Sequence, residues 1–234
     1  MKIGFIGLGR MGKAMVLNAL EHKHEIVANN RSREPIDEVK SVGAIGAYSV
    51  EEIFQHLTDE KQKVVWLMLT AGNLIDEKIN ELLPYLSSGD IIIDGGNSWF
   101  EDSQRRGKEL SSKGIHFIDC GTSGGVNGAR HGACMMIGGE NEAFKIIEPL
   151  VRDLCTKDGY AHVGKCGAGH FVKMVHNGIE YGMMAALGEG FQAHENLKEK
   201  LGLNLHDIAR VYAHGSIIEG KLTSWTESGL KRAD

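Results

Sequence analysis

A glycine-rich turn lies near the start of the chain, directly after a short apolar segment and directly before a helical pattern. The turn consists of Gly7, Leu8, Gly9, Arg10, Met11 and Gly12, in the spacing G-x-G-x-x-G. In this context the first glycine permits a tight turn, the second lets a pyrophosphate approach the backbone, and the third lets the helix pack on the strand. The N–H groups at the start of the helix attract the same anion. The alternative is a glycine-rich turn without a ligand, but strand, spacing and helix together favour a dinucleotide site formed by these six residues.

Strand-like and helix-like segments alternate over about the first 165 residues. Apolar runs predict strands at 2–6, 25–28, 63–69, 90–94 and 116–119. Between them, apolar residues at intervals of three and four predict helices at 11–21, 50–57, 74–86 and 101–113. Such alternation is typical of a parallel sheet covered by helices. We therefore predict an α/β fold, a Rossmann-type doubly wound parallel sheet in residues 1–165 that binds NAD or NADP.

The end of the second predicted strand indicates which dinucleotide the chain binds. A site for NAD usually places Asp or Glu there, where the carboxylate bonds the ribose 2′-hydroxyl. This segment instead contains Asn30, Arg31, Ser32 and Arg33, and no carboxylate. The arginines offer planar, permanently charged donors for a 2′-phosphate, and the neighbouring amide and hydroxyl can add neutral hydrogen bonds. We predict NADP as the cofactor, with NAD as the alternative if both arginines are only solvated loop residues.

Two further glycine-rich loops follow the fourth and fifth predicted strands. The first loop, DGGNS at 94–98, includes Asn97; the second, at 120–130, includes Ser123, Gly124 and Gly125. In an open α/β sheet, ligands bind beyond the carboxyl ends of the strands. Backbone amides, a hydroxyl and side-chain amides at this edge suit a polyol or a carboxylate. Taken alone, the loops are equally consistent with glycines that only satisfy turn geometry.

The pattern changes near residue 165, where a proline-free segment from 168 to about 201 has apolar residues at helical intervals. We predict one long helix there, a second helix near 211–222, and an all-helical region over 166–234. Five polar side chains of the long helix share one face, because they recur at steps of three and four: Lys173, His176, Asn177, Glu180 and Tyr181. Lys173 and Glu180 are two turns apart, about 10 Å along the axis, so a base and an acid there can act on two carbons of one extended substrate. The alternative is that both are solvated surface charges.

These motifs together resemble those of one enzyme family. The segments GLGRMG, DGGN, TSGG and GAGHFVKMVHNGIEYG are similar to those of the 6-phosphogluconate dehydrogenases, and the resemblance covers residues 1 to about 190. Relatives of the hydroxyisobutyrate type typically have a second asparagine where this chain has Gly178, and they lack the pair formed by His176 and Glu180. The resemblance therefore points to the decarboxylating sugar-acid enzymes.

The resemblance implies a reaction and a role for each residue of the site. The reaction is oxidative decarboxylation of 6-phosphogluconate to ribulose 5-phosphate and CO₂, with reduction of NADP and without a metal. Lys173 would be the general base and Glu180 the general acid, and Asn97 would lie near both nicotinamide and substrate. The other substrate contacts would come from Ser123, Gly124, Gly125, His176, Asn177 and Tyr181.

Two features depart from the resembling family. The family's helical domain continues further, so we expect residues 166–234 to be only its start, and the later basic residues that bind the substrate phosphate are not assigned. The family also often has lysine where Thr70 stands, at one cofactor contact. Two other functions stay open: a non-decarboxylating β-hydroxyacid dehydrogenase of the hydroxyisobutyrate type, and an NADP-binding module without turnover.

Charge and composition limit the partners that the chain can have. The 234 residues carry 26 Lys and Arg against 31 Asp and Glu, a formal charge of −5, whereas nucleic-acid binding needs a basic excess. No apolar run reaches the roughly 18 residues of a membrane span, and the N-terminus lacks a signal-peptide pattern. The four cysteines show no C-x-x-C spacing, so no metal site is predicted. We expect a cytoplasmic enzyme that acts on a small molecule as a homodimer or higher homo-oligomer.

Overall fold

The computed structural model describes residues 1–231. The chain divides into two compact units, Met1–Met174 and Val175–Asp234. Helix α8 (Ala168–Leu201) runs through the boundary, so its first turns belong to the first unit and the rest to the second. No helix of the described residues is long and apolar enough to cross a membrane. Within the same residues, no group of three or more His, Cys, Asp and Glu side chains is placed to hold a metal ion.

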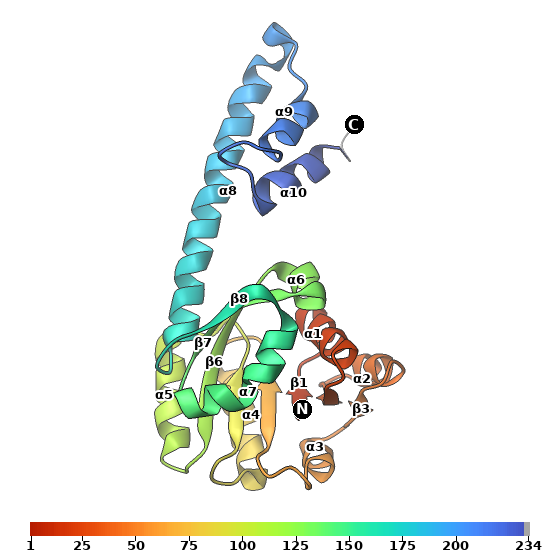
Figure 1. Ribbon diagram of the computed structural model, residues 1–234, viewed down its shortest axis with the longest axis vertical. Helices are drawn as coiled ribbons and strands as arrows, with labels where there is room; N and C mark the ends of the chain where they lie inside the picture. The colour runs from red at the N-terminus through yellow and green to blue at the C-terminus, as the bar shows by residue number, and fades with distance from the viewer. Residues whose placement is uncertain (232–234) are drawn as a thin grey trace. The chain divides into compact units, whose positions relative to one another are not determined.

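The first unit is built on one eight-stranded sheet (Figure 1). Its strands are β1 (Lys2–Ile6), β2 (Glu25–Asn29), β3 (Ile45–Gly46), β4 (Val64–Leu67), β5 (Ile91–Asp94), β6 (His116–Ser123), β7 (Ala133–Gly138) and β8 (Cys155–Gly164). Their order is β3-β2-β1-β4-β5-β6-β7-β8, and neighbours are parallel except β6 and β7. The first six strands thus follow the order of dinucleotide-binding sheets. The predicted doubly wound fold is confirmed, and the antiparallel pairing of β6 with β7 departs from an all-parallel sheet.

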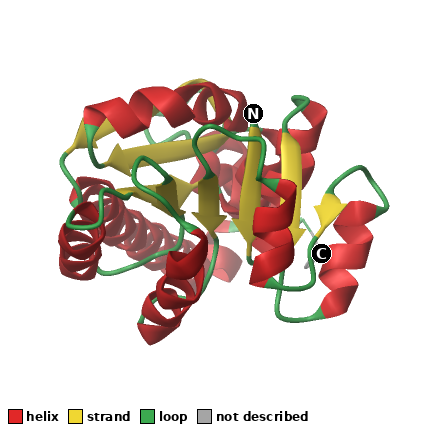
Figure 2. Cartoon of the chain, turned by 90° about the horizontal axis from the view of Figure 1, so that it is seen from below, coloured by secondary structure: helices red, strands yellow, loops and turns green. Residues whose placement is uncertain are grey.

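Helices cover both faces of this sheet (Figure 2). They are α1 (Arg10–Glu21), α2 (Arg33–Lys40), α3 (Val50–His56), α4 (Asn73–Leu82) with the short 3₁₀ helix η1 (Leu83–Tyr85), α5 (Phe100–Ser111), α6 (Gly125–His131) and α7 (Asn141–Leu154). One apolar cluster joins α1, α2, α6 and α7 to the sheet, and a second joins α3, α4 and α5. Alternate side chains of β4 enter the two clusters, with Trp66 in the first and Leu67 in the second. Burial on both faces explains why the central strands are almost continuous apolar runs.

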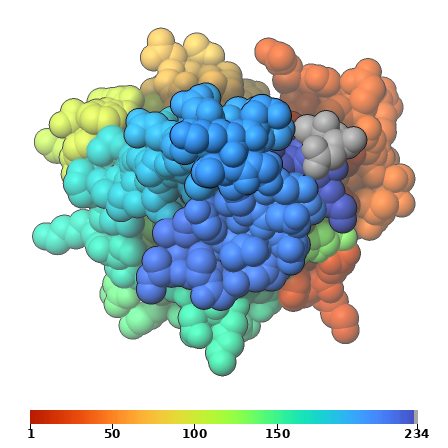
Figure 3. Space-filling model, turned by 90° about the horizontal axis from the view of Figure 1, so that it is seen from above, coloured from red at the N-terminus to blue at the C-terminus, as the bar shows by residue number. Residues whose placement is uncertain are grey.

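The second unit consists of the remainder of α8, α9 (Leu205–Tyr212) and α10 (Lys221–Leu230). Tyr212 joins α9 to α8, because its ring contacts Phe191 and its hydroxyl lies 3.2 Å from His194 Nε2. In a space-filling view, the light-blue end of α8 and the darker α9 and α10 form one continuous surface (Figure 3). The predicted long helix followed by an all-helical region is confirmed.

The helix predicted at 211–222 is wrong. Helix α9 ends at Tyr212 and α10 begins at Lys221, and the connection contains Gly215 in the left-handed region at φ +81°. Thr223 stabilises the start of α10, since its hydroxyl accepts a hydrogen bond of 2.9 Å from the N–H of Gly220. Ile217 and Ile218, the large apolar residues of this connection, are exposed and do not form a buried face.

Candidate active site

The glycine-rich turn between β1 and α1 has the geometry that a pyrophosphate site needs. Gly7 is in the left-handed region at φ +104°, and a Cβ there would overlap the carbonyl oxygen of Met68 at the end of β4. A Cβ at Gly12 would overlap the carbonyl oxygen of Gly7, so α1 packs closely on the turn. Gly9, at the N-cap of α1, has open space where its Cβ would be. The turn is therefore tight on its inner side and open at Gly9, where an anion can approach the start of α1.

Asn30, at the end of β2, stabilises this turn. Its side-chain oxygen accepts a hydrogen bond of 3.0 Å from the N–H of Leu8, and its Nδ2 donates to the carbonyl oxygen of Ser32 at 3.3 Å. The carboxamide thus links the glycine-rich turn to the loop in which the 2′-phosphate contacts are predicted. In the structure its hydrogen bonds go to the backbone on both sides, so Asn30 orders the loop.

The two arginines of this loop have different surroundings. Arg33 Nε lies 3.3 Å from Asp37 Oδ2, and its guanidinium stacks over the ring of Tyr48, 4.7 Å from the ring centre. The Tyr48 hydroxyl and then Arg33 hold the pKa of Asp37 below its ordinary value. Arg31 is exposed and makes no ion pair with any residue of 1–231. Of the two arginines, Arg31 is therefore the one available to a phosphate.

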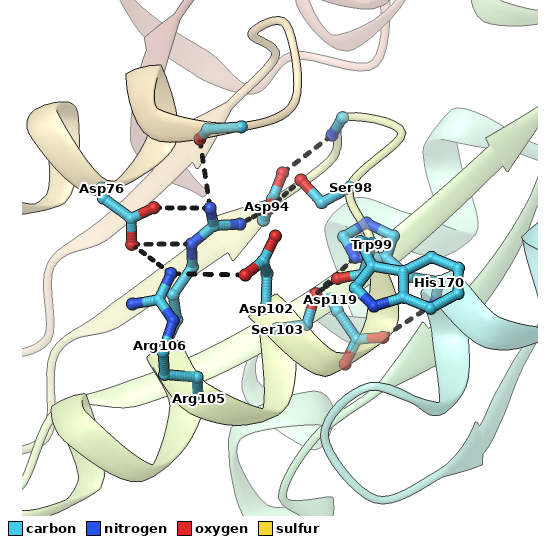
Figure 4. Close-up of polar contacts among 12 residues, drawn as sticks. Asp76, Asp94, Ser98, Trp99, Asp102, Ser103, Arg105, Arg106, Asp119 and His170 are labelled. Carbon is cyan, nitrogen blue, oxygen red and sulfur yellow. Dashed lines mark hydrogen bonds and ion pairs between the residues drawn. The ribbon is translucent and has the colours of Figure 1, made fainter.

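The loop after β5 is held by the carboxylate of Asp94, which is fully buried. Asp94 accepts hydrogen bonds from the N–H of Gly96 at 3.0 Å and from Ser98 Oγ at 2.7 Å (Figure 4). A Cβ at Gly96 would come within 2.8 Å of the carbonyl oxygen of Leu69, so the loop lies directly against the end of β4. Asn97, between these anchored residues, is exposed.

The loop after β6 lies beyond the same edge of the sheet. β5 and β6 are parallel neighbours, with Asp94 opposite Asp119, and β6 ends at Ser123. Gly124 and Gly125 both have positive φ, at +114° and +62°, and lead directly into α6. The fold therefore places the loops that carry Asn97 and Ser123 side by side in sheet order.

The start of α8 is seated on β6 and β7 by the side-chain carboxylate of Asp119 and by close backbone contacts. Asp119, buried in β6, accepts hydrogen bonds from the N–H groups of Gly167 at 2.7 Å and of His170 at 2.8 Å. A Cβ at Gly169 would overlap the carbonyl oxygen of Asp119, and a Cβ at Gly121 would overlap the Cβ of Lys173. Lys173 is 8% exposed. The predicted base is thus buried against β6, close to the loop that carries Ser123.

The other polar residues of the helix face belong to the second unit. His176 and Glu180 lie one turn apart, with His176 Nδ1 3.7 Å from Glu180 Oε2, and both side chains are about one-third exposed. Asn177 is half-buried and Tyr181 is 72% exposed. Because α8 is continuous, Lys173 and Glu180 keep the separation of two helical turns expected from the sequence.

The sequence did not identify the residues that hold these loops and the helix start. They are Asp94, Asp119, Ser103, Arg106 and His170, all buried. The two aspartates do leave a signal, since each is a carboxylate inside or at the end of an otherwise apolar strand. Such a group must find hydrogen-bond donors when it is buried. The three others gave no signal, because their partners are more than 25 residues away in sequence.

Family models and sequence relatives point to one family. Residues 2–165 match the family model for the NAD binding domain of 6-phosphogluconate dehydrogenase, and residues 169–225 match the model for the C-terminal domain of 6-phosphogluconate dehydrogenase. The chain is 40% identical to an NAD(+)-dependent, decarboxylating 6-phosphogluconate dehydrogenase of Haloferax volcanii, over 99% of the chain and 75% of that protein. It is 42% identical to an NADP(+)-dependent, decarboxylating 6-phosphogluconate dehydrogenase of Bacillus subtilis, over 96% of the chain and 48% of that protein.

A solved structure shows the same architecture. The 6-phosphogluconate dehydrogenase of Plasmodium falciparum, studied in its apo form, with its cofactor NADP+ and with its substrate 6-phosphogluconate, matches with a TM-score of 0.91 and 32% identity. The match covers 100% of this chain and 52% of the Plasmodium chain. The chain thus spans about half the length of the Plasmodium and Bacillus proteins and three quarters of the Haloferax protein.

Proposed function

The chain belongs to the 6-phosphogluconate dehydrogenase family, and from this membership we propose that it catalyses oxidative decarboxylation of 6-phosphogluconate to ribulose 5-phosphate and CO₂. The observation that carries the proposal is the seating of α8, which places Lys173 against β6 next to the loop of Ser123. The two alternatives are a hydroxyisobutyrate-type dehydrogenase and a binding module without turnover, and neither has comparable support. Measuring reduced cofactor and CO₂ together distinguishes the three functions.

The geometry of the turn after β1 fits a dinucleotide. Gly9 leaves room for a pyrophosphate at the start of α1, and Asn30 holds Leu8 in place. When bound, the dinucleotide accepts a hydride from the substrate. Arg31 is exposed at the end of β2 and suits a 2′-phosphate, so we propose NADP as the cofactor. NAD is the second candidate, because the Haloferax relative, of which the chain spans three quarters, is named as NAD(+)-dependent.

The residues of α8 supply the proton transfers in this proposal. Lys173, in its neutral form, accepts the proton of the C3 hydroxyl when C3 is oxidised. The resulting β-keto acid loses CO₂, since the new carbonyl accepts the electrons, and protonated Lys173 stabilises the enolate oxygen. Glu180 then donates a proton to C1 of the enediol. Asn97, Ser123, Gly124, Gly125, His176, Asn177 and Tyr181 would bind and orient the sugar acid.

A spectrophotometric assay tests the proposal directly. The chain is incubated with 6-phosphogluconate and either NADP or NAD, and reduced cofactor and CO₂ are measured together. Equal amounts of both products support oxidative decarboxylation, and the cofactor that gives the higher rate is the preferred one. Reduced cofactor without CO₂ would indicate a non-decarboxylating dehydrogenase. Cofactor binding without either product would indicate a binding module.

The oligomeric state and the cellular location of the chain belong to the same proposal. The second unit exposes large apolar side chains, including Ile179 and Trp225, which favours association with another copy. We propose a homodimer or higher homo-oligomer, and light scattering after size-exclusion chromatography measures its mass. A cytoplasmic location, expected from the sequence, is tested by cell fractionation.

A further inference from the structure

Helix α5 carries two buried polar side chains that the proposed reaction does not use. Ser103 and Arg106 are 0% and 2% exposed and lie three residues apart, so they share the inner face of the helix. Ser103 Oγ lies 2.7 Å from His170 Nδ1, in the first turn of α8. Arg106 points to the loops after β4 and β5 (Figure 4). One face of α5 thus contacts both the first turn of α8 and the loops that follow β4 and β5.

Most of the Arg106 guanidinium is bound to the segment that follows β4. Its Nε lies 3.0 Å from Asp76 Oδ1 and its Nη2 lies 2.8 Å from Asp76 Oδ2, which is a two-pronged ion pair. Nη2 also donates to the carbonyl oxygen of Gly72 at 3.1 Å. Gly72 is the N-cap of α4 and has φ +106°. Arg106 therefore fixes both the backbone turn at Gly72 and the first turn of α4.

The remaining nitrogen of the guanidinium faces the loop after β5. Arg106 Nη1 lies 3.6 Å from Asp94 Oδ2 and has no hydrogen-bond partner among the described residues. Asp94 is the carboxylate that holds the backbone of Gly96 and the hydroxyl of Ser98, on either side of Asn97. A single charged group thus contacts the anchors of two adjacent loops.

Burial makes this charge difficult to replace. Asp94 is 0% exposed, and a buried carboxylate without a nearby cation is unfavourable. The guanidinium is always protonated, and its planar fork reaches Asp76, Gly72 and Asp94 together, which one lysine ammonium cannot do. Arg105 provides a natural comparison, because it also binds Asp76, at 2.8 Å, but its side chain is 45% exposed and its ion pairs lie on the surface.

We propose that Arg106 is a positioning residue, which fixes the position of the loop that carries Asn97 relative to the turn at Gly72. The effect on turnover rests on the function proposed above, whereas the effect on the loops does not. Arg106 itself is buried, so we expect it to act through Asp94 and Gly72 and not to touch substrate or cofactor. Its loss should loosen the two loops and leave the glycine-rich turn after β1 unchanged.

Hydrogen–deuterium exchange of the full chain tests the structural part. In Arg106→Met we expect the backbone amides of 70–74 and 94–99 to exchange at least tenfold faster than in the parent chain, while those of 2–21 stay within twofold. The control, Arg105→Met, should match the parent in all three segments. Parental exchange at 94–99, or an equal acceleration in every segment, would overturn the proposal. If Arg106→Met does not fold, Arg106→Lys keeps the charge without the fork, and parental exchange at 94–99 in that variant would overturn it equally.

Steady-state kinetics test the consequence for the reaction. We expect kcat of Arg106→Met to fall at least tenfold, with KM for the dinucleotide within threefold of the parent value, and Arg105→Met within twofold in both constants. A parental kcat in folded Arg106→Met would contradict a positioning role. If the parent chain itself shows no turnover, the proposed function fails, and the exchange experiment still decides whether Arg106 positions the loops.

Discussion

The seating of α8 on the sheet depends on the carboxylate of Asp119, and we expect the substitution Asp119→Asn to weaken it measurably. Asp119 is fully buried and accepts two hydrogen bonds, one of 2.7 Å from Gly167, directly before the helix, and one of 2.8 Å from His170, in its first turn. Asparagine has nearly the same shape, but it has only one acceptor oxygen. One backbone N–H, of Gly167 or His170, would therefore face an NH₂ group.

The magnitude follows from the number and type of these bonds. Loss of one charge-assisted hydrogen bond costs about 1.5–3 kcal/mol. Loss of the negative charge at a helix N-terminus adds about 0.3–2 kcal/mol, and part of the total is offset because an amide is easier to bury than a carboxylate. We expect a decrease of about 2–3 kcal/mol in the free energy of unfolding, or about 4–12 °C in Tm for a chain of this size.

Thermal unfolding followed by circular dichroism measures this change, with denaturant unfolding as a second probe. The matched control is Asp102→Asn, because Asp102 is 41% exposed and its ion pair with Arg105, at 3.5 Å, is a surface contact. Such pairs contribute at most about 1 kcal/mol. If Asp119→Asn melts within 1 °C of the parent chain, the first turn of α8 does not depend on this carboxylate and the reasoning is refuted.

Four further outcomes are expected. Gly9→Ala should keep Tm within about 2 °C of the parent value, because a Cβ there meets nothing within 4 Å. The same variant should bind the dinucleotide at least tenfold more weakly in a fluorescence titration, and parental affinity would exclude the pyrophosphate from this position. Arg31→Asp should weaken NADP binding by about 10- to 150-fold and NAD binding by less than threefold, and equal losses would contradict the role of Arg31. Glu180→Gln should slow proton delivery to C1 more than hydride transfer, so a parental kcat would identify a surface carboxylate. Arg106 lowers the pKa of Asp76 below its ordinary value of 3.8, so the stability from this ion pair is present above pH 4 and is lost as the pH falls further. Tm should therefore drop more steeply between pH 4 and pH 2 in the parent chain than in Asp76→Asn, and parallel curves would argue against a stabilising role of the ion pair.

Strands β1, β2, β4, β5 and β6 and the long helix could be predicted because their signals are local, whereas β3, with only two residues, was not predicted. The strands at 2–6 and 90–94 are apolar runs bounded by glycine or charge, and the helix from 168 to 201 has a sustained period. α6 and β8 could not be predicted in the same way. α6 is short and begins inside a glycine-rich loop, at Gly125 with Gly124 as its N-cap. The side chains of β8 are half-buried or exposed, so neither element has an apolar period.

The candidate site shows the same division. The spacing of Lys173 and Glu180 on one helix face is a local property, and the continuous helix preserves it. The contacts that hold the site are long-range: Asp119 and His170 are 51 residues apart, and Arg106 and Asp76 are 30 apart. A single sequence gives no periodicity for such pairs. Only the order of the strands places them together.

The link between Asn30 and Leu8 has a consequence for the kinetics and entropy of ligand capture. A glycine-rich segment is the most flexible kind of backbone, and ordering it on binding would remove much of the gain from the new contacts. Here the hydrogen bond of 3.0 Å from Leu8 fixes the segment before any ligand arrives. The binding site is thus preorganised, and little conformational freedom remains to be lost. We expect association to occur in a single fast step, without a slow rearrangement of the turn after the first encounter.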